Sequence, residues 1–143
     1  IVAALELGGR RQSSEALERL SISGSRDAYL AMKNQLADLP HEEFWVLYLN
    51  RANKVITQQQ VSRGGVTGTV ADMKIIFKKA IELLASSVIL FHNHPSGSLK
   101  PSQADIRLTK RLKEAGETLE IAVLDHLIIS SKGFFSFVDE GML

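Results

Sequence analysis

Apolar residues recur at the spacing of an α-helix in three parts of the chain. The first part follows the turn-rich residues 21–25, and Pro40 is expected to end it. The second begins at Asp72, whose carboxylate can cap a helix N-terminus. The third covers about residues 102–115 and is expected to close at Gly116. The apolar stripes that support the first two helices are Ala28, Tyr29, Met32, Leu36 and Leu39 in the first and Ile76, Phe77, Ala80, Ile81 and Leu84 in the second.

Short apolar runs bounded by turn residues predict β-strands between these helices. Residues 44–49 and 55–63 flank a turn sequence at 50–53, which predicts a hairpin. Residues 87–91 form a β-branched apolar run that is typical of a central strand. The strands expected further along the chain are 119–124, 127–129 and 134–138. Helices that alternate with strands predict an α/β fold, with a mixed β-sheet flanked by helices.

The length of the chain favours a single domain, which we place at residues 22–143. A chain of 143 residues is long enough to bury a hydrophobic core. Residues 1–21 contain a break at Gly8-Gly9 and several polar residues, so we expect them to be a linker or the tail of a preceding domain. The first methionine is Met32, and the sequence is therefore expected to be a fragment.

The composition argues against several classes of protein. Hydrophobic residues make up 45% and charged residues 23%, which is ordinary for a globular domain. Cysteine is absent, which excludes disulfides and thiolate metal sites and fits a reducing cytoplasm. The net charge of +1 is too small to argue for nucleic acid or a membrane surface. No apolar run approaches the roughly 20 residues of a membrane-spanning helix, so we expect a cytoplasmic protein with no membrane partner.

Two histidines and an aspartate carry the chemistry that the sequence indicates. His92 and His94 end the predicted central strand, and alternate residues of an extended chain point to the same side. Asp105 falls in the first turn of the next helix, and a loop with two prolines and a glycine can return its carboxylate toward the histidines. Two imidazoles and a carboxylate suit zinc, and three protein ligands leave a fourth position for water. We therefore predict a Zn²⁺ site at His92, His94 and Asp105.

Each of these residues also has a purely structural interpretation. A His-x-His pair by itself is common in loops, and Ser102 with Asp105 fits a capping box at a helix start. The two roles are compatible, because Ser102 can cap the helix and still present its hydroxyl to a site. The complete run from His92 through Pro101 to Asp105 is far rarer than its parts and favours the metal. His126 is expected to be a hydrogen-bonded core histidine rather than a fourth zinc ligand.

The run His92-Asn93-His94-Pro95-Ser96-Gly97, followed by Pro101-Ser102-Gln103-Ala104-Asp105, resembles the JAMM motif of the bacterial RadC proteins. Residues 125–129 and 135–143 are similar to that family too, and the resemblance covers about residues 22–143. It implies a cytidine-deaminase-like JAMM (MPN) fold, and residues 3–8 resemble the tail of the family's helix-hairpin-helix region. It also implies that zinc-bound water hydrolyses a peptide or isopeptide bond. In that reaction His92, His94 and Asp105 match the zinc ligands, and Ser102 matches a serine that supports the oxyanion.

One position departs from the pattern of that family. JAMM peptidases need an upstream glutamate as general base, and RadC-like sequences usually place it five residues before a glycine. Counting back from Gly64 reaches Gln59, and no acidic residue occurs between Glu43 and Asp72. An amide can hydrogen-bond water but cannot take its proton. We therefore predict zinc binding with weak or absent hydrolysis.

Two other functions stay open as alternatives. The missing glutamate favours a non-catalytic zinc-binding interaction module. The traditional DNA-repair label of the family suggests a DNA-associated accessory domain, but that label is an association and the mild charge gives nucleic acid little support. Basic residues lie within 74–79 and 100–113, where a solvated helix face is the default over a phosphate-binding strip. The sequence leaves open the substrate and whether the protein is a homo-oligomer.

Overall fold

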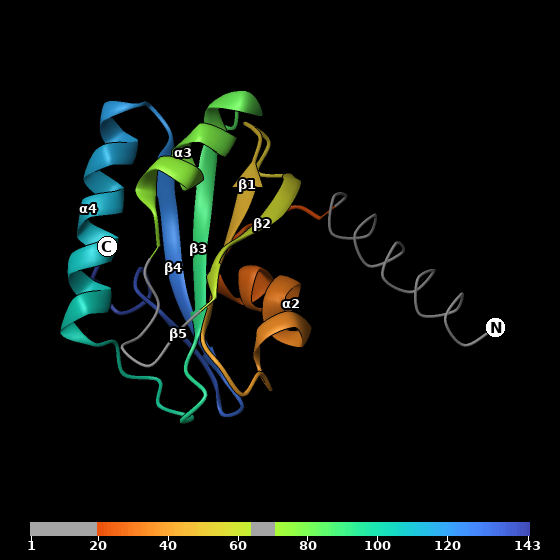
Figure 1. The fold of residues 1–143 in the computed structure, drawn as a ribbon. Helices are drawn as coiled ribbons and strands as arrows, with labels where there is room; N and C mark the ends of the chain where they lie inside the picture. Colours follow the sequence, from red (N-terminus) through yellow and green to blue (C-terminus); the bar gives the residue numbers. More distant parts are fainter. Residues whose placement is uncertain (1–19, 64–70) are drawn as a thin grey trace.

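A five-stranded mixed sheet forms the centre of the protein (Figure 1). The structure is a computed structural model, and it describes residues 20–63 and 71–143. β3 and β4 are parallel, and the other neighbouring strands are antiparallel, so the predicted hairpin of β1 and β2 is confirmed. In spatial order the strands are β2 (Val55–Arg63), β1 (Glu43–Leu49), β3 (Ser87–Asn93), β4 (Ala122–Ser130) and β5 (Gly133–Ser136).

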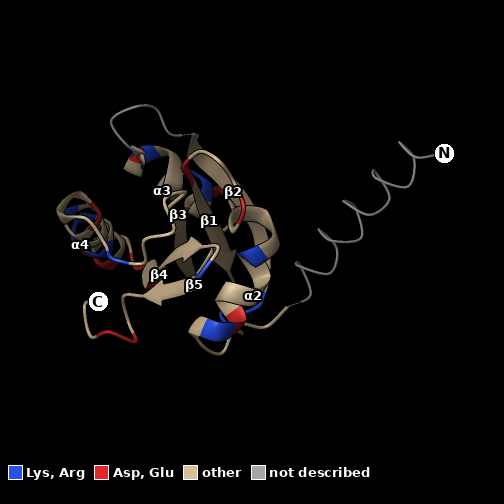
Figure 2. Ribbon diagram, turned by 90° about the horizontal axis from the view of Figure 1, so that it is seen from below, with Lys and Arg blue, Asp and Glu red and all other residues tan. Residues whose placement is uncertain are grey.

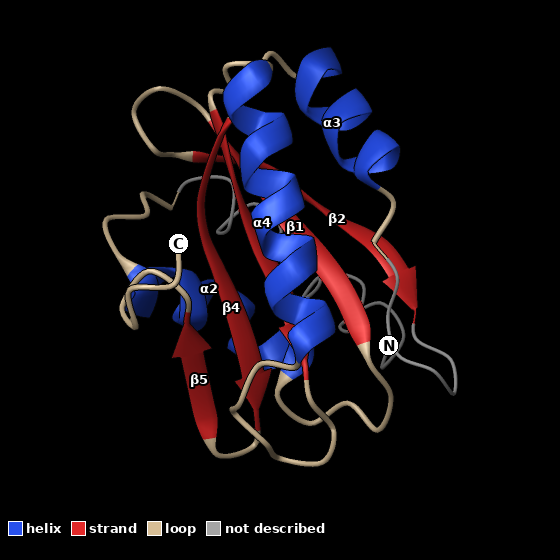
Figure 3. Cartoon of the chain, turned by 90° about the vertical axis from the view of Figure 1, so that its left-hand side faces the viewer, coloured by secondary structure: helices blue, strands red, loops and turns tan. Residues whose placement is uncertain are grey.

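Three helices cover the two faces of this sheet within the described part of the chain (Figure 3). α2 (Ser25–Leu36) packs on one face, whereas α3 (Met73–Glu82) and α4 (Gln103–Thr118) lie on the other. α4 connects β3 to β4, because two parallel strands can be joined only by a crossover. The architecture is α/β with a mixed sheet between helices, as the sequence predicts.

Alternating side chains of β1 divide the core into two layers. Phe44, Val46 and Tyr48 pack in the layer of α3 and α4, and Leu47 and Leu49 pack in the layer of α2. This follows from the geometry of a strand, in which successive side chains face opposite sides. The neighbouring strand β3 is buried along its whole length. Side chains at the end of β3 are therefore held between helical layers before they reach the surface.

Gly116 does not end α4, contrary to the prediction from the sequence. The helix continues to Thr118, and Gly116 is buried inside it. A Cβ atom at Gly116 would lie 2.3 Å from the backbone oxygen of Ile121. Glycine is needed at this position because the chain turns back closely onto the helix before β4, rather than because the helix stops there.

β4 is one continuous strand, where the sequence predicted two shorter ones. The polar pair Asp125 and His126 lies inside the strand without breaking it. The Asp125 carboxylate accepts hydrogen bonds from Ser136 Oγ at 2.6 Å and from the Val138 backbone N–H at 3.1 Å. Because this buried carboxylate is satisfied by the next segment of the chain, the strand can continue through it.

The other differences concern the ends of elements. α2 ends at Leu36, before Pro40, and β5 ends at Ser136 rather than at residue 138. β3 continues past the predicted end at residue 91 to Asn93, so that His92 lies within the strand and His94 just after it. The predicted cap of α3 is confirmed, because the Asp72 carboxylate accepts a hydrogen bond of 2.8 Å from the Lys74 N–H.

The expected tail at residues 1–21 falls almost entirely outside the described residues. Ser21, which is described, forms an isolated antiparallel bridge with Lys54. None of the helices within 20–63 and 71–143 is long and apolar enough to cross a membrane.

Candidate metal centre

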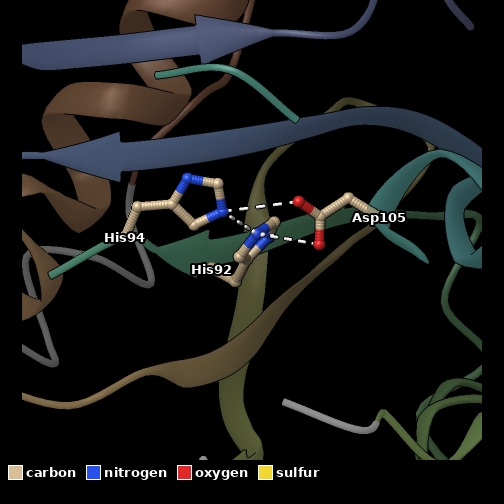
Figure 4. Close-up of side chains that lie close together, drawn as sticks. All are labelled: His92, His94 and Asp105. Carbon is tan, nitrogen blue, oxygen red and sulfur yellow. Dashed lines mark hydrogen bonds and ion pairs between the residues drawn. The ribbon is translucent and has the colours of Figure 1, made fainter. Parts of the chain in front are cut away.

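His92, His94 and Asp105 converge at the C-terminal end of β3 (Figure 4). The Nε2 atoms of the two histidines are 2.9 Å apart. The Asp105 carboxylate lies across from both, with Oδ1 3.3 Å from His92 Nε2 and Oδ2 3.3 Å from His94 Nε2. One potential ligand atom from each residue therefore lies within 4.8 Å of the other two. The structure brings together the three residues that the sequence selected.

Backbone hydrogen bonds fix the loop that joins the histidines to α4. The His94 N–H donates to the Ile129 carbonyl at 3.0 Å, which holds the residue after β3 against β4. The Gly97 N–H donates to the His94 carbonyl at 3.0 Å and closes a turn. Gly97 has a φ angle of +88°, a conformation that glycine adopts at little cost. The turn therefore sends the chain away from His94 toward the start of α4.

A capping box at the start of α4 fixes the carboxylate. The Ser102 hydroxyl oxygen accepts from the Asp105 N–H at 3.0 Å, and the Ser102 N–H donates to Asp105 Oδ2 at 2.8 Å. This is the structural role that the sequence suggested for both residues. It coexists with the cluster, because Oδ2 still faces His94 and Oδ1 faces His92.

The hydrogen bonds of His94 show which ring nitrogen can serve as a ligand. Its Nδ1 lies 2.9 Å from the carbonyl oxygen of Ser98. A carbonyl can only accept, so Nδ1 carries the proton and the neutral ring presents a lone pair at Nε2. That lone pair faces His92 Nε2 and the carboxylate of Asp105. Electron-pair donors at these separations repel one another unless a cation lies among them, so the arrangement is compatible with a metal ion.

The surroundings of Asp105 and His94 shift the pKa values of these two side chains. Burial acts to raise the pKa of Asp105, but in the metal-free protein the hydrogen bonds that protonated His92 and His94 rings can donate outweigh it and hold that pKa well below its usual range. Burial acts to lower the pKa of His94, but the hydrogen bonds with Asp105 and the Ser98 carbonyl, and the charges of Asp105 and Glu42, leave it raised. Asp105 is therefore ionised, as a metal ligand must be.

The three side chains differ in their access to solvent. The His92 side chain is 3% exposed, whereas those of His94 and Asp105 are 12% and 18% exposed. The cluster thus has a protein-covered side at His92 and a more open side at the other two residues.

His126 lies behind His92 and is fully buried, as expected for a core histidine. Its Nε2 is 2.8 Å from His92 Nδ1, and its Nδ1 is 2.6 Å from Thr109 Oγ1. Its ring stacks on Phe137 and meets Phe44 edge-on. Burial holds the pKa of His126 well below its usual range. Both ring nitrogens are therefore engaged, one by Thr109 and the other by the rear nitrogen of His92, so that His126 is a hydrogen-bonded core histidine, as expected, and not a member of the cluster of potential ligand atoms.

Gln59 has a different neighbourhood from the one its proposed role requires. It lies on the edge strand β2, where it pairs with Val46, whereas Ser62 is the β2 residue level with His92 across β1. Its Oε1 accepts a hydrogen bond of 2.9 Å from the Tyr48 hydroxyl. The count back from Gly64 therefore reaches a residue that is bonded elsewhere in the sheet.

Glu42 is the acidic residue near the cluster that the sequence reasoning missed. It immediately precedes β1, whose Phe44 is the antiparallel partner of His92. Residues two apart in an extended chain share a face, which directs Glu42 toward the face of His92. Its negative charge contributes to the raised pKa of His94. In the sequence, Glu42 is recognisable as a glutamate just before the strand that pairs with β3, two residues before the apolar Phe44.

Comparisons with known proteins agree with this geometry. The sequence model of the RadC-like JAB domain family matches residues 22–142. The chain is 52% identical over 142 residues to a UPF0758 protein of Flavobacterium johnsoniae, and the match covers 99% of this chain and 62% of that protein. It is 49% identical over 144 residues to a UPF0758 protein of Porphyromonas gingivalis, covering 100% of this chain and 63% of that protein.

A more distant relative gives the same result. A UPF0758 protein of Staphylococcus haemolyticus is 41% identical over 139 residues, which cover 97% of this chain and 61% of that protein. The chain thus spans less than two thirds of the length of these three relatives. The mixed sheet, the group of two histidines and an aspartate, and these matches lead to one conclusion: the chain belongs to the RadC-like JAB domain family.

Proposed function

We propose that this domain is a zinc-dependent hydrolase that cleaves a peptide or isopeptide bond. The observation that carries the proposal is the convergence of His92 Nε2, His94 Nε2 and the Asp105 carboxylate on one point. The family adds support, because the JAMM motif that this run resembles belongs to metallopeptidases.

The donor set favours zinc among the common divalent ions. Two imidazoles and one carboxylate suit zinc, whereas magnesium and calcium prefer oxygen ligands alone. Three protein ligands are typical of a catalytic rather than a structural zinc site. A zinc ion held by His92, His94 and Asp105 would supply Lewis acidity, which polarises a carbonyl group and acidifies water.

Glu42 is the general base in this proposal, in place of Gln59. A carboxylate can accept the proton of an attacking water, and an amide cannot. Glu42 precedes the strand that pairs with β3, and its charge acts on His94 at the more open side of the cluster. The expectation of weak hydrolysis rested on the lack of a glutamate near Gln59, and an acidic residue at Glu42 removes that reason.

Ser102 is the oxyanion donor in this proposal. Its hydroxyl oxygen accepts from the Asp105 N–H, and its own proton can still be donated. The residue is exposed at the start of α4, beside the carboxylate of Asp105. A donor in this position can stabilise charge that develops only in the transition state.

The experiment compares Glu42→Gln with Gln59→Glu on a panel of peptide and isopeptide substrates, using zinc-loaded protein. We expect wild type and Gln59→Glu to hydrolyse the same substrates at similar rates. Glu42→Gln should lower kcat/KM by about 10²- to 10⁴-fold with unchanged zinc content. Wild-type activity in Glu42→Gln would exclude the proposed base. A zinc-loaded wild type that cleaves nothing in the panel would favour the non-catalytic interaction module.

The distribution of charged side chains gives little support to nucleic acid as a partner, which stays a prediction. Figure 2 shows Lys and Arg positions spread over all three helices, together with acidic ones. On α4 the basic residues Arg107, Lys110 and Arg111 are exposed, while Leu112 packs into the core, which is the expected solvated face. Among the residues that the structure describes, the basic side chains do not form the single stripe that binds backbone phosphates.

A further inference from the structure

We infer that Thr109 and His126 are positioning residues that fix the proton of His92 on Nδ1, so that His92 Nε2 is presented as a bare electron-pair donor. The expected effect on zinc binding rests on the proposed metal centre, whereas the positions of the ring protons can be measured in metal-free protein. It follows from three consecutive hydrogen bonds whose direction can be assigned one after the other.

The backbone carbonyl of Asp105 fixes the direction of the first hydrogen bond. Thr109 Oγ1 lies 2.7 Å from the backbone oxygen of Asp105, one turn earlier in α4. That oxygen has no proton, so the single hydroxyl proton of Thr109 is donated to it. Thr109 Oγ1 also lies 2.6 Å from His126 Nδ1. With its proton already used, the hydroxyl can only accept there, and His126 Nδ1 must carry a proton.

The proton on His126 Nδ1 then fixes the direction of the hydrogen bond between His126 and His92. Its ring is fully buried, stacked on Phe137 at a centroid distance of 4.8 Å and in edge contact with Phe44 at 5.5 Å. A neutral imidazole has one proton, and here that proton is on Nδ1, so Nε2 is an acceptor. The partner of Nε2 is His92 Nδ1 at 2.8 Å. His92 therefore donates through Nδ1, and its Nε2 holds the lone pair that faces His94 and Asp105.

The chain of hydrogen bonds ties two of the three clustered residues together from behind. It runs from the main chain of Asp105 through Thr109 and His126 to His92, and so links α4 to β3 through β4. Histidine ligands usually have their second nitrogen held by a carboxylate, a carbonyl or water, and losing that partner typically weakens metal binding by 10- to 100-fold. In this chain a neutral histidine performs that task and adds no charge to the cluster.

α4 offers a matched control for Thr109. Thr118 also donates from Oγ1 to the carbonyl oxygen four residues earlier, that of Glu114, at 3.2 Å. It is exposed and lies at the other end of the helix. Thr118→Val therefore removes the same kind of hydroxyl as Thr109→Val without touching the relay. Thr109→Ser keeps the hydroxyl and serves as the conservative variant.

The experiment has two measurements on the same proteins. In metal-free wild type, ¹H–¹⁵N NMR of the imidazole rings should show His92 protonated on Nδ1. Thr109→Val and His126→Phe should populate the Nε2-protonated form of His92, whereas Thr109→Ser and Thr118→Val should match wild type. Zinc affinity, measured by competition with a chromogenic chelator, should fall by about 10- to 100-fold in Thr109→Val and His126→Phe and stay unchanged in the other two.

The outcomes separate this inference from the proposed function. An Nε2-protonated His92 in wild type, or wild-type zinc affinity in folded Thr109→Val, would overturn the relay. A wild type with the expected tautomer but no zinc binding would support the relay and contradict the metal centre. If His126→Phe fails to fold, as judged by circular dichroism, the Thr109 variants decide the result.

Discussion

The Asn93 side-chain oxygen accepts a hydrogen bond of 2.7 Å from the backbone N–H of Glu43. The same amide donates through Nδ2 to the His41 carbonyl at 2.8 Å. Asn93, the residue between the two histidines of the His-x-His run, therefore holds the backbone on both sides of Glu42. Asn93 is 1% exposed, so water cannot replace either bond. The segment that carries two proposed metal ligands thus also places the proposed base.

Asn93→Ala should reduce both stability and turnover. The substitution leaves the Glu43 N–H and the His41 carbonyl without their partner, which should lower the unfolding free energy by about 1–3 kcal/mol. Because Glu42 loses its support, kcat should also fall while zinc content stays at the wild-type level. Urea unfolding and steady-state kinetics measure the two effects, and the exposed Asn34→Ala on α2 is the control. An Asn93→Ala protein as stable and active as the control would contradict this account.

Gly116→Ala should destabilise the protein although alanine is the better helix former. Its Cβ would meet the Ile121 backbone oxygen at 2.3 Å, so α4 and the start of β4 would have to move apart. Overpacking of this kind typically costs about 1–3 kcal/mol. Gly24→Ala, where a Cβ would meet nothing within 4 Å, should have a smaller effect in the same unfolding experiment. Equal stability of the two variants would show that the connection after α4 yields easily.

Asp125 should make the protein relatively more stable at low pH. Burial raises its pKa above 3.8 and outweighs the hydrogen bonds from Ser136, Val138 and His126, which lower it. The folded state thus holds this proton more tightly than the unfolded chain. The resulting stabilisation is fully present below pH 3.8 and is lost as the pH rises through the folded-state pKa.

Asp125→Asn removes this titrating group, which gives the test. The difference in unfolding free energy between wild type and Asp125→Asn should shift in favour of the variant as the pH is raised from about 3 to 7. Asp38→Asn, at an exposed position, controls for the loss of one negative charge. A difference that stays constant over this pH range, or shifts toward wild type, would show that the hydrogen bonds outweigh burial.

The fold could be predicted largely because hydrophobic periodicity matches burial in this chain. Ala28, Met32 and Leu36 do form the buried stripe of α2, and Ile76, Phe77 and Ala80 that of α3, whereas Ile81 and Leu84 of the predicted stripe are exposed. The prediction failed where a tertiary contact decides the outcome. Gly116 is a glycine because of Ile121, five residues further on, and β4 passes through polar residues because Ser136 and Val138 satisfy Asp125.

The clustered site residues could be predicted because they lie within one short run of sequence. His92, His94 and Asp105 are joined by a single loop, so spacing alone indicates their convergence. Glu42 and His126 come from other strands and meet the cluster only through sheet pairing. Placing them beside the cluster needs the register of β1 against β3 and of β3 against β4, which the sequence does not supply. Glu42 lies just before Glu43 and therefore outside the interval from Glu43 to Asp72 in which a general base was expected.

The most direct test of the metal centre is the zinc content of the purified chain. Metal analysis after exposure to zinc and removal of the excess should find about one equivalent in wild type and in His41→Ala, whose imidazole contacts Glu43 instead. His94→Ala and Asp105→Asn should lose most of that zinc, because each removes one of the three converging ligand atoms. Less than about half an equivalent in wild type, or a full equivalent in folded His94→Ala, would contradict the account.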